Sequence, residues 1–281
     1  MIRLIWDLDG TLIDSSSEII QSLELAVEKS GLELAKQIAP FIVGPTIDKI
    51  LRKSFPSDIM TDDLSNKIIG SFRKIYDNLD FEQTRPYPGV ENIIFDKGNF
   101  VHYIVTNKPD MPTNRILNRL NWSKYITNIK TPYSNSNVPY KKMRSKSDLF
   151  MDIISESGAE VSSFIGIGDM KTDCVAAKDN NITAVGVLWG SGTCEELSGC
   201  CDYLFENTKQ LCDFLCEWEN DHENNLEKIL SNVQLNNLDD YTVVVFGAGN
   251  TSVLYQKCFK NEGIHPVYYI DNDYIETIFK N

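Results

Sequence analysis

The chain has 281 residues, of which 42% are hydrophobic and 24% are charged, and this ordinary globular composition excludes a wholly disordered or fibrous protein. Its length suits about two domains. Acidic residues outnumber basic residues 40 to 27, and the net charge of −13 disfavours nucleic acid or an anionic membrane as a partner.

Hydropathy and cysteine usage indicate a cytoplasmic protein. No apolar run reaches the roughly 18 residues of a membrane span, and the first apolar stretch ends at Asp7, so neither a transmembrane helix nor a signal peptide is expected. The seven cysteines include no C-x-x-C pair, which disfavours a disulfide framework or zinc ribbon and predicts reduced thiols. The three histidines lie in no motif. Any chemistry must therefore use carboxylates, lysine and hydroxyl groups.

The amino-terminal part of the chain predicts one strand followed by a helical insertion. Residues 3–6 are apolar and end abruptly in acids and a glycine, which is typical of the carboxyl end of a parallel strand. From Ser15 to about Glu82 the apolar residues follow a helical period, and Ser15 to Ser17 can cap the first helix. About four helices and no strand are expected here.

Strands and helices alternate after residue 86. The pattern predicts helices over residues 90–96, 111–120, 149–156 and 173–179, and strands over residues 101–105, 163–167 and 183–188. Strands separated by helices indicate right-handed crossovers and a parallel sheet covered on both faces. We therefore expect an α/β fold, with a Rossmann-like parallel sheet core and an inserted α-helical cap.

The carboxyl-terminal part differs in character. Residues 217–240 hold seven acids and one lysine and predict a solvated helical linker. Residues 241–281 predict one βαβ segment, in which Gly247-Ala248-Gly249 resembles a dinucleotide-binding turn. Ser252 replaces the third glycine, and one βαβ unit cannot form the two-halved crevice that holds a dinucleotide. The segment is interpreted as part of a larger domain that is missing here, or as a docking site for a protein partner.

Polar residues from four segments are expected at the carboxyl edge of the sheet. They are Asp7 and Asp9, Thr106 and Asn107, Lys146, and Asp169 with Asp173. We expect the chain to turn at Leu8, and Gly10 permits that turn. Clustered carboxylates select a hard divalent ion, and Mg²⁺ is the usual choice for phosphate chemistry.

These residue types suit phosphoryl transfer. With Mg²⁺ bound, one carboxylate can attack phosphorus while Lys146 helps to hold the charge on the other phosphate oxygens. The attack would give an aspartyl-phosphate intermediate. The second acid at the strand end can protonate the leaving oxygen and then deprotonate the water that hydrolyses the intermediate.

The motifs and their order resemble the haloacid dehalogenase superfamily, and within it the phosphoglycolate phosphatase-like members with a helical cap. The resemblance rests on residues 7–15, 105–109, 146–149 and 166–169 and extends over residues 1 to about 216. It implies a core of residues 1–14 and 86–216 and a cap of residues 15–85. The presence of an acid at Asp9 disfavours carbon–halogen cleavage, because true dehalogenases lack it.

The resemblance also implies a role for each site residue. Asp7 would be the nucleophile and Asp9 the general acid/base, and Thr106, Asn107 and Lys146 would bind phosphate. Mg²⁺ would be held by Asp7, the Asp9 carbonyl and Asp169, with Asp173 supporting the metal from behind. Lys141, Lys142 and Arg144 are alternatives to Lys146, which is favoured because it directly precedes a helix.

The expected function is a Mg²⁺-dependent phosphatase that hydrolyses a small phosphate monoester. One alternative is a phosphomutase that acts on a sugar phosphate, and another is a non-catalytic binding or regulatory module. Asp173 can equally cap the helix that follows it. The eight bases and no acids of residues 112–147 could steer a phosphorylated substrate, although a solvated helix face and loop are preferred. The sequence does not specify the phosphate ester.

Overall fold

The computed structural model describes residues 1–96, 100–132, 144–218, 244–246 and 268–270. The chain divides into two compact units, Met1–Asp213 and Phe214–Asn281. In the second unit the described residues are the helical residues 214–218 and two parallel strands, β9 (Val244–Phe246) and β10 (Tyr268–Ile270), which lie within the predicted βαβ segment. The predicted glycine-rich turn at Gly247 and most of the acidic linker lie outside the described residues.

The first unit contains a six-stranded parallel sheet, which confirms the predicted α/β fold. In the order β5-β4-β1-β6-β7-β8, the strands are Ile126–Lys130, Phe100–Val105, Ile2–Trp6, Phe164–Gly168, Thr183–Val187 and Tyr203–Phe205. The two edge strands, β5 and β8, were not predicted. Both are only partly buried and β8 has three residues, so neither shows the continuous apolar run of a strand buried on both faces.

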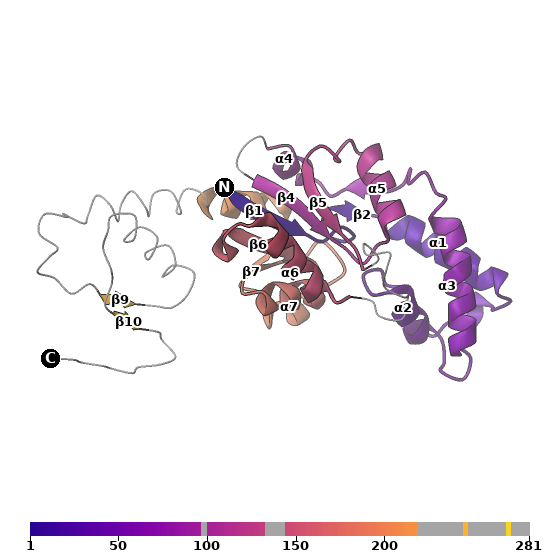
Figure 1. Ribbon diagram of the computed structural model, residues 1–281. Helices are drawn as coiled ribbons and strands as arrows, with labels where there is room; N and C mark the ends of the chain where they lie inside the picture. Colours follow the sequence, from indigo (N-terminus) through magenta and orange to yellow (C-terminus); the bar gives the residue numbers. More distant parts are fainter. Residues whose placement is uncertain (97–99, 133–143, 219–243, 247–267, 271–281) are drawn as a thin grey trace, which may run out of the picture. The chain divides into compact units, whose positions relative to one another are not determined.

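Helices cover both faces of this sheet. They are α4 (Val90–Ile94), α5 (Asp110–Arg119), α6 (Lys146–Ser157), α7 (Lys171–Asp179) and the short α8 (Cys194–Ser198), with a 3-10 turn, η2, at Val161–Ser163. The strand order moves one way from β1 to β5 and the other way from β6 to β8. Right-handed crossovers therefore place α4 and α5 on one face and α6 and α7 on the other, as Figure 1 shows.

The core lies between the central strands and helices α6 and α7. Phe150 and Ile153 of α6 and Ala177 of α7 pack with buried residues of β1, β4 and β6. Trp6 at the end of β1 is level with Ile104 in β4 and with Ile167 in β6. The loops that follow these three strands therefore leave the sheet at nearly the same height, on the edge where open α/β sheets place their ligands.

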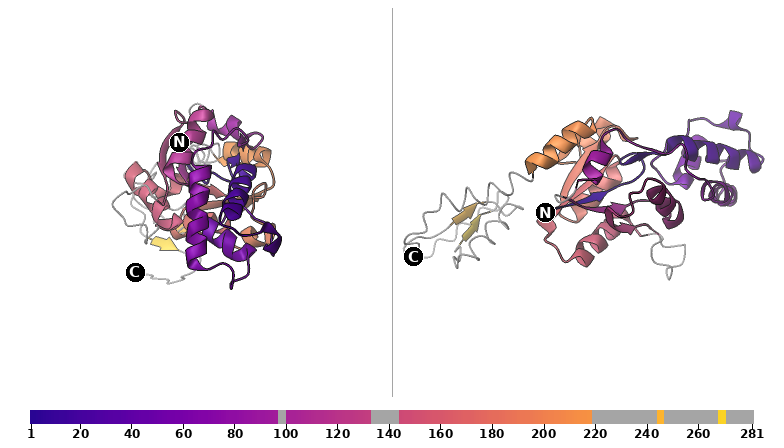
Figure 2. Two further views of the ribbon diagram at one scale, coloured as in Figure 1. Left: turned by 90° about the vertical axis from the view of Figure 1, so that its right-hand side faces the viewer. Right: turned by 90° about the horizontal axis from the view of Figure 1, so that it is seen from above.

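A helical segment is inserted after β1. The short strand β2 (Ile13–Asp14) pairs antiparallel with β3 (Arg85–Pro86), and we call residues 15–84 between them the cap. The cap contains α1 (Ser16–Lys29), the 3-10 turn η1 (Leu34–Lys36), α2 (Ile47–Ser54) and α3 (Asp62–Tyr76). Figures 1 and 2 show these helices beyond the carboxyl ends of the strands.

The cap helices form because their apolar residues recur at helical spacing. In α3 the buried residues are Ser65, Ile68, Phe72 and Tyr76, which are three or four positions apart and line one face. Thr61 begins the helix by accepting a hydrogen bond from the Leu64 amide at 3.3 Å. The buried face of α3 packs against α1.

Hydrogen bonds fasten the two ends of the cap to each other and to the core. The buried Glu18 carboxylate accepts hydrogen bonds from the Gln83 amide at 3.0 Å and from the Thr84 hydroxyl. Arg115 of α5 donates to the carbonyl of Asp77 at 2.8 Å, and Arg119 donates to that of Thr84 at 3.0 Å. Two bases of the positive stretch 112–147 are thus bound to carbonyl groups of the cap.

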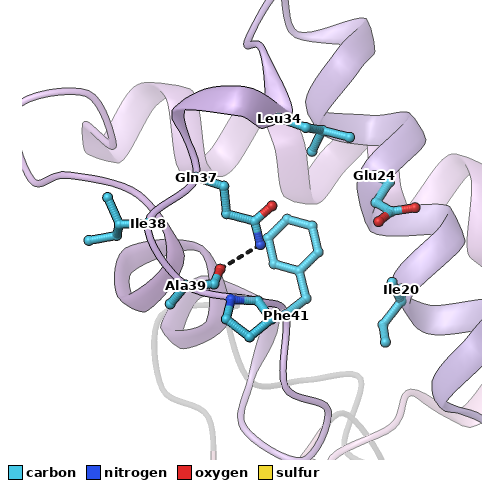
Figure 3. Close-up of a pocket in the computed structure, with 8 residues that line it drawn as sticks. Ile20, Glu24, Leu34, Gln37, Ile38, Ala39 and Phe41 are labelled. Carbon is cyan, nitrogen blue, oxygen red and sulfur yellow. Dashed lines mark hydrogen bonds between the residues drawn. The ribbon is translucent and has the colours of Figure 1, made fainter.

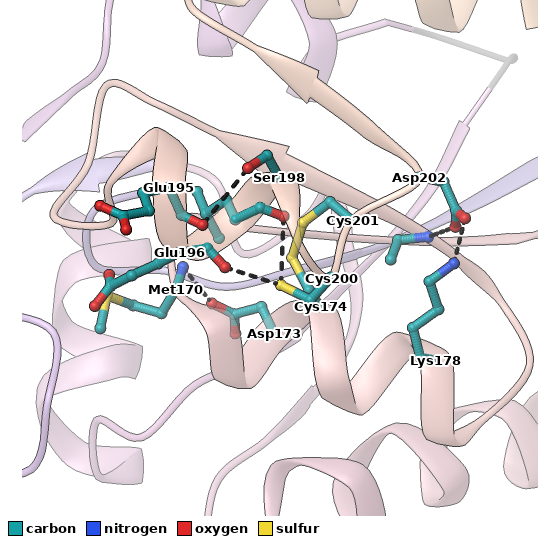
Figure 4. Close-up of a disulfide and its surroundings, with 12 residues drawn as sticks. Met170, Asp173, Cys174, Lys178, Glu195, Glu196, Ser198, Cys200, Cys201 and Asp202 are labelled. Carbon is teal, nitrogen blue, oxygen red and sulfur yellow. Dashed lines mark hydrogen bonds and ion pairs between the residues drawn. A yellow bond between two sulfur atoms is a disulfide. The ribbon is translucent and has the colours of Figure 1, made fainter.

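The cysteine prediction is wrong for one pair, because Cys174 and Cys201 form a disulfide (Figure 4). Cys174 lies on α7 and Cys201 just before β8, with 5.4 Å between their Cα atoms. The two are 27 residues apart, so no local sequence pattern signals the bond. Among the described residues, no helix combines the length and hydrophobicity needed to cross a membrane.

His102 gives the fold a specific pH dependence. It is buried in β4, and its Nδ1 accepts a hydrogen bond from the Trp6 indole at 3.1 Å. Burial lowers the pKa of His102 to about 4, against the opposing charge of Asp96. The unfolded chain takes up a proton near pH 6.5, whereas the folded chain does so only near pH 4.

We therefore expect the free energy of unfolding to fall between about pH 6.5 and 4, by at most about 1.4 kcal/mol per pH unit from His102. In a His102→Gln variant the amide oxygen can accept from Trp6 but does not titrate, so its pH dependence should be shallower. Urea unfolding of both proteins at several pH values measures this. If the free energy of unfolding depended equally on pH in the two proteins, His102 would have no such effect.

Candidate active site

The residues after β1 form a tight turn that brings two acids to one edge of the sheet. Leu12 and Ile13 donate backbone hydrogen bonds to the Leu8 carbonyl at 3.0 and 3.1 Å, so the chain folds back directly after Asp7. Gly10 has φ +86°, and a Cβ there would lie 2.3 Å from Asp169 Oδ2. Only glycine fits this close approach.

Three of the predicted acids form a buried cluster. Carboxylate oxygens of Asp7, Asp169 and Asp173 all lie within 4.8 Å of one another. Asp169 follows β6 and accepts hydrogen bonds from the Ser191 amide at 2.7 Å and the Thr11 hydroxyl at 3.2 Å. Carboxylates at this spacing are suitable ligands for a hard divalent cation.

Asp173 has the capping role considered for it and also pairs with Lys146. It lies in the first turn of α7 and accepts a hydrogen bond from the Met170 amide at 3.0 Å, so it caps the helix. Its other oxygen pairs with the Lys146 ammonium group (Figure 4 shows Asp173 and Met170). Asp173 therefore orients both the helix and the lysine.

Lys146 reaches the cluster from the first position of α6. Ser145 and Asp148 form a capping box with two 3.1 Å hydrogen bonds, which begins the helix at Lys146. The Lys146 Nζ lies 2.9 Å from Asp7 Oδ1, and its side chain is 7% exposed. Arg144 pairs with Asp152 instead, and Lys141 and Lys142 lie outside the described residues.

The negative charges of the cluster outnumber the positive charge that Lys146 brings to it. Burial raises the pKa of Asp7 well above its usual range; Lys146 opposes this, whereas Asp173 and Asp169 add to it. Burial and the charge of Asp173 raise the pKa of Asp169 to about 6. Burial alone would lower the pKa of Lys146, but Asp173 and Asp7 outweigh it and the pKa is raised. One ammonium group thus serves three carboxylates, and a bound cation would relieve their repulsion.

Asp9 lies on the cap side of the site and has a partner that the sequence did not predict. The buried Lys108 Nζ is 3.0 Å from Asp9 Oδ1, and it also contacts the hydroxyl of Tyr76 at the end of α3. Burial raises the pKa of Tyr76 to about 12, so this hydroxyl keeps its proton. The Ser15 hydroxyl also donates to Asp9. The only sequence signal for Lys108 was its place directly after Thr106 and Asn107.

Thr106 and Asn107 lie in the loop after β4, next to the strand that ends at Asp7. Thr106 is buried, and its hydroxyl accepts a hydrogen bond from the Lys108 amide at 3.1 Å. Asn107 lines a cavity of about 390 Å³ together with Asp9 and Lys108. No described contact joins Thr106 or Asn107 directly to the acid cluster.

A second hollow of about 450 Å³ lies on the cap, between α1 and the segment that includes η1 (Figure 3). Ile20 and Glu24 of α1 line one side, and Gln37, whose side chain donates to the Ala39 carbonyl, lines the other. None of the predicted site residues lines it.

Comparison with known proteins identifies the family. The model for haloacid dehalogenase-like hydrolases matches residues 4–187, which is well over half of the chain. The chain belongs to the haloacid dehalogenase-like hydrolases. The expected resemblance is thus confirmed, and the protein is a hydrolase of this family. Its sequence and fold are phosphoglycolate phosphatase-like.

Curated relatives and solved structures agree with this placement. The chain is 28% identical over 200 residues to a phosphoglycolate phosphatase of Neisseria meningitidis, covering 69% of this chain and 83% of that protein. It is 27% identical over 192 residues to a phosphoglycolate phosphatase of Aquifex aeolicus, with 66% and 84% covered. A haloacid dehalogenase-like family protein from Streptococcus pneumoniae has a similar fold, with a TM-score of 0.64 at 19% identity over 76% of this chain and 98% of its own.

Gly190 in the loop after β7 offers a test of how tightly the site is packed. A Cβ there would lie 2.3 Å from the Gly10 carbonyl oxygen and 2.4 Å from Asp169 Oδ2. We expect Gly190→Ala to lower the free energy of unfolding by about 1–3 kcal/mol, because both neighbours must move. Urea unfolding measures the change. The control is Gly199→Ala, where nothing lies within 4 Å of an added Cβ, and equal stability of the two variants would refute the prediction.

Proposed function

We propose that this hydrolase is a Mg²⁺-dependent phosphatase that hydrolyses a small phosphate monoester through an aspartyl-phosphate on Asp7. The observation that carries the proposal is the contact of Lys146 with Asp7 inside a buried cluster of three carboxylates. The names of the phosphoglycolate phosphatase relatives support phosphate monoesters as the substrate class.

The donor set fits the expected metal. Asp7 and Asp169 supply hard oxygen ligands, and burial together with mutual repulsion disfavours their full charge without a cation. Asp7, the Asp9 carbonyl and Asp169 would hold Mg²⁺. When bound, the ion would neutralise charge on the phosphoryl oxygens. Asp173 would act indirectly, because it holds Lys146 beside Asp7.

The side chains of this protein then account for both halves of the reaction. Lys146 holds the Asp7 carboxylate in place beside the phosphate. An Asp7 oxygen bonds to phosphorus as the bond to the ester oxygen breaks, and Asp9 gives that oxygen a proton. In the second half, Asp9 takes a proton from water as the water oxygen attacks phosphorus and releases Asp7.

Other residues position these groups. Lys108 and Ser15 hold the Asp9 carboxylate from two sides, and Tyr76 holds Lys108 from the cap. Thr106 and Asn107, at the end of the neighbouring strand β4, would bind the phosphate oxygens together with Lys146.

Replacing the proposed nucleophile tests the chemistry. Asp7→Asn should reduce phosphate release by on the order of 10³-fold or more, because an amide is a poor nucleophile. Release of inorganic phosphate from a panel of phosphate monoesters with Mg²⁺ measures this, and the control is Asp63→Asn at an exposed position of α3. Equal activity of wild type and Asp7→Asn would favour a non-catalytic module. Formation of an isomeric sugar phosphate in place of free phosphate would favour a phosphomutase.

The metal site makes a separate prediction about stability. Mg²⁺ at about 100 times its Kd should stabilise the wild-type protein by about 2.7 kcal/mol, because it binds only the folded chain. Asp169→Asn should lose most of this gain, whereas Asp58→Asn at an exposed position should keep it. Thermal unfolding with and without Mg²⁺ measures the effect. An unchanged gain in Asp169→Asn would exclude Asp169 as a metal ligand.

A further inference from the structure

The cavity beside Asp9 carries information about the substrate. Its volume of about 390 Å³ lies within the range of roughly 300–1,000 Å³ that is typical of small-molecule sites. Asp9 lines it and is also the proposed acid for the leaving oxygen. The carbon part of a substrate, which begins at that oxygen, would therefore extend from Asp9 into this cavity.

The wall that the cap contributes is largely apolar. The apolar side chains of the cap that line it are those of Ile19, Val43, Pro45, Ile47, Ile50, Ile69 and Phe72. The amide of Asn66 lies among the lining residues and could bind a hydroxyl or carbonyl group. A two-carbon leaving group would leave most of this apolar surface in contact with water, which is unfavourable.

The charges that line the cavity are already paired within the protein. Lys108 pairs with Asp9 at 3.0 Å. On the cap, Asp48 pairs with Arg52 at 2.9 Å, and Arg73 lies 3.8 Å from Asp77. These pairs involve every charged residue that lines the cavity. A carboxylate on the leaving group would therefore meet cations that are already neutralised, and it would lie near two acids.

The cap and core already meet on both sides of this cavity. On one side Tyr76 contacts Lys108. On the other, Gly44 lies so close to the core that an added Cβ would be 3.2 Å from Met170 Sδ and 3.5 Å from Ser191 Cβ. The volume and lining of the cavity are thus those of a closed arrangement, in which the cap contacts the core.

Resting on the proposed phosphatase function, we propose that the preferred substrate is the phosphate monoester of a medium-sized, uncharged and largely apolar alcohol. Its apolar part would pack on the cap wall of the cavity, while its phosphate lies against Asp7 and Lys146. Specificity would then come mainly from the burial of apolar surface, for which each methylene group typically changes kcat/KM by about tenfold or more.

Three phosphate esters separate the contributions, with Mg²⁺ present and free phosphate as the readout. n-Hexyl phosphate and ethyl phosphate differ only in apolar length, and 2-phosphoglycolate adds a carboxylate to a two-carbon chain. We expect kcat/KM for the hexyl ester to exceed that for each of the other two at least about tenfold. Ile69→Asp should reduce the hexyl-to-ethyl ratio at least about tenfold, because it places a charge in the apolar wall. Ile38→Asp, at a position of the cap that is 70% exposed, should leave the ratio unchanged.

The outcomes distinguish the two levels of the proposal. Release of phosphate with 2-phosphoglycolate or ethyl phosphate equal to or better than hexyl phosphate would overturn the substrate class but keep the phosphatase. An unchanged hexyl-to-ethyl ratio in Ile69→Asp would likewise show that the apolar wall does not bind the substrate. No release from any ester would overturn the phosphatase function and, with it, this inference.

Discussion

The repulsion among three buried carboxylates is the constraint on which the rest of the structure depends. Asp7, Asp169 and Asp173 share one buried ammonium group, and burying charges is costly unless they are paired. The surrounding structure holds them together all the same. The turn at Gly10 and the hydrogen bond from the Ser191 amide keep the carboxylates close. This repulsion thus lowers the stability of the folded chain at the place where the binding of an ion and a phosphate would release the most free energy.

The same arrangement links the cap to the chemistry. Asp9 belongs to the core, but the lysine that holds it is itself held by Tyr76 of the cap. In the closed arrangement the cap therefore does more than exclude water, because it also completes the surroundings of the proposed acid/base. Under the proposed mechanism, the binding of the leaving group and the transfer of its proton would depend on the same few contacts.

Much of this site could be predicted from the sequence, because strands buried on both faces have continuous apolar runs and their ends carry the acids. The pairing of β1 with β6, in which Trp6 lies level with Ile167, then brings Asp7 and Asp169 to the same edge of the sheet. Lys108 could not be predicted in the same way, since the hydroxyl that gives it a role lies on a helix 32 residues earlier. The edge strands and the Cys174–Cys201 pair were missed because they depend on neighbours in space and have no local pattern.

The narrow junction between β2 and β3 has a consequence for the evolution of such enzymes. Two paired residues on each strand, with Glu18 bridging α1 to residues 83–84, fix the gap at which the chain leaves the sheet and returns to it. Any segment whose ends match this gap can be exchanged without disturbing the strands below. Replacement of this module would change selectivity and the Tyr76 contact with Lys108, but it would leave in place the strand ends that carry Asp7 and Asp169.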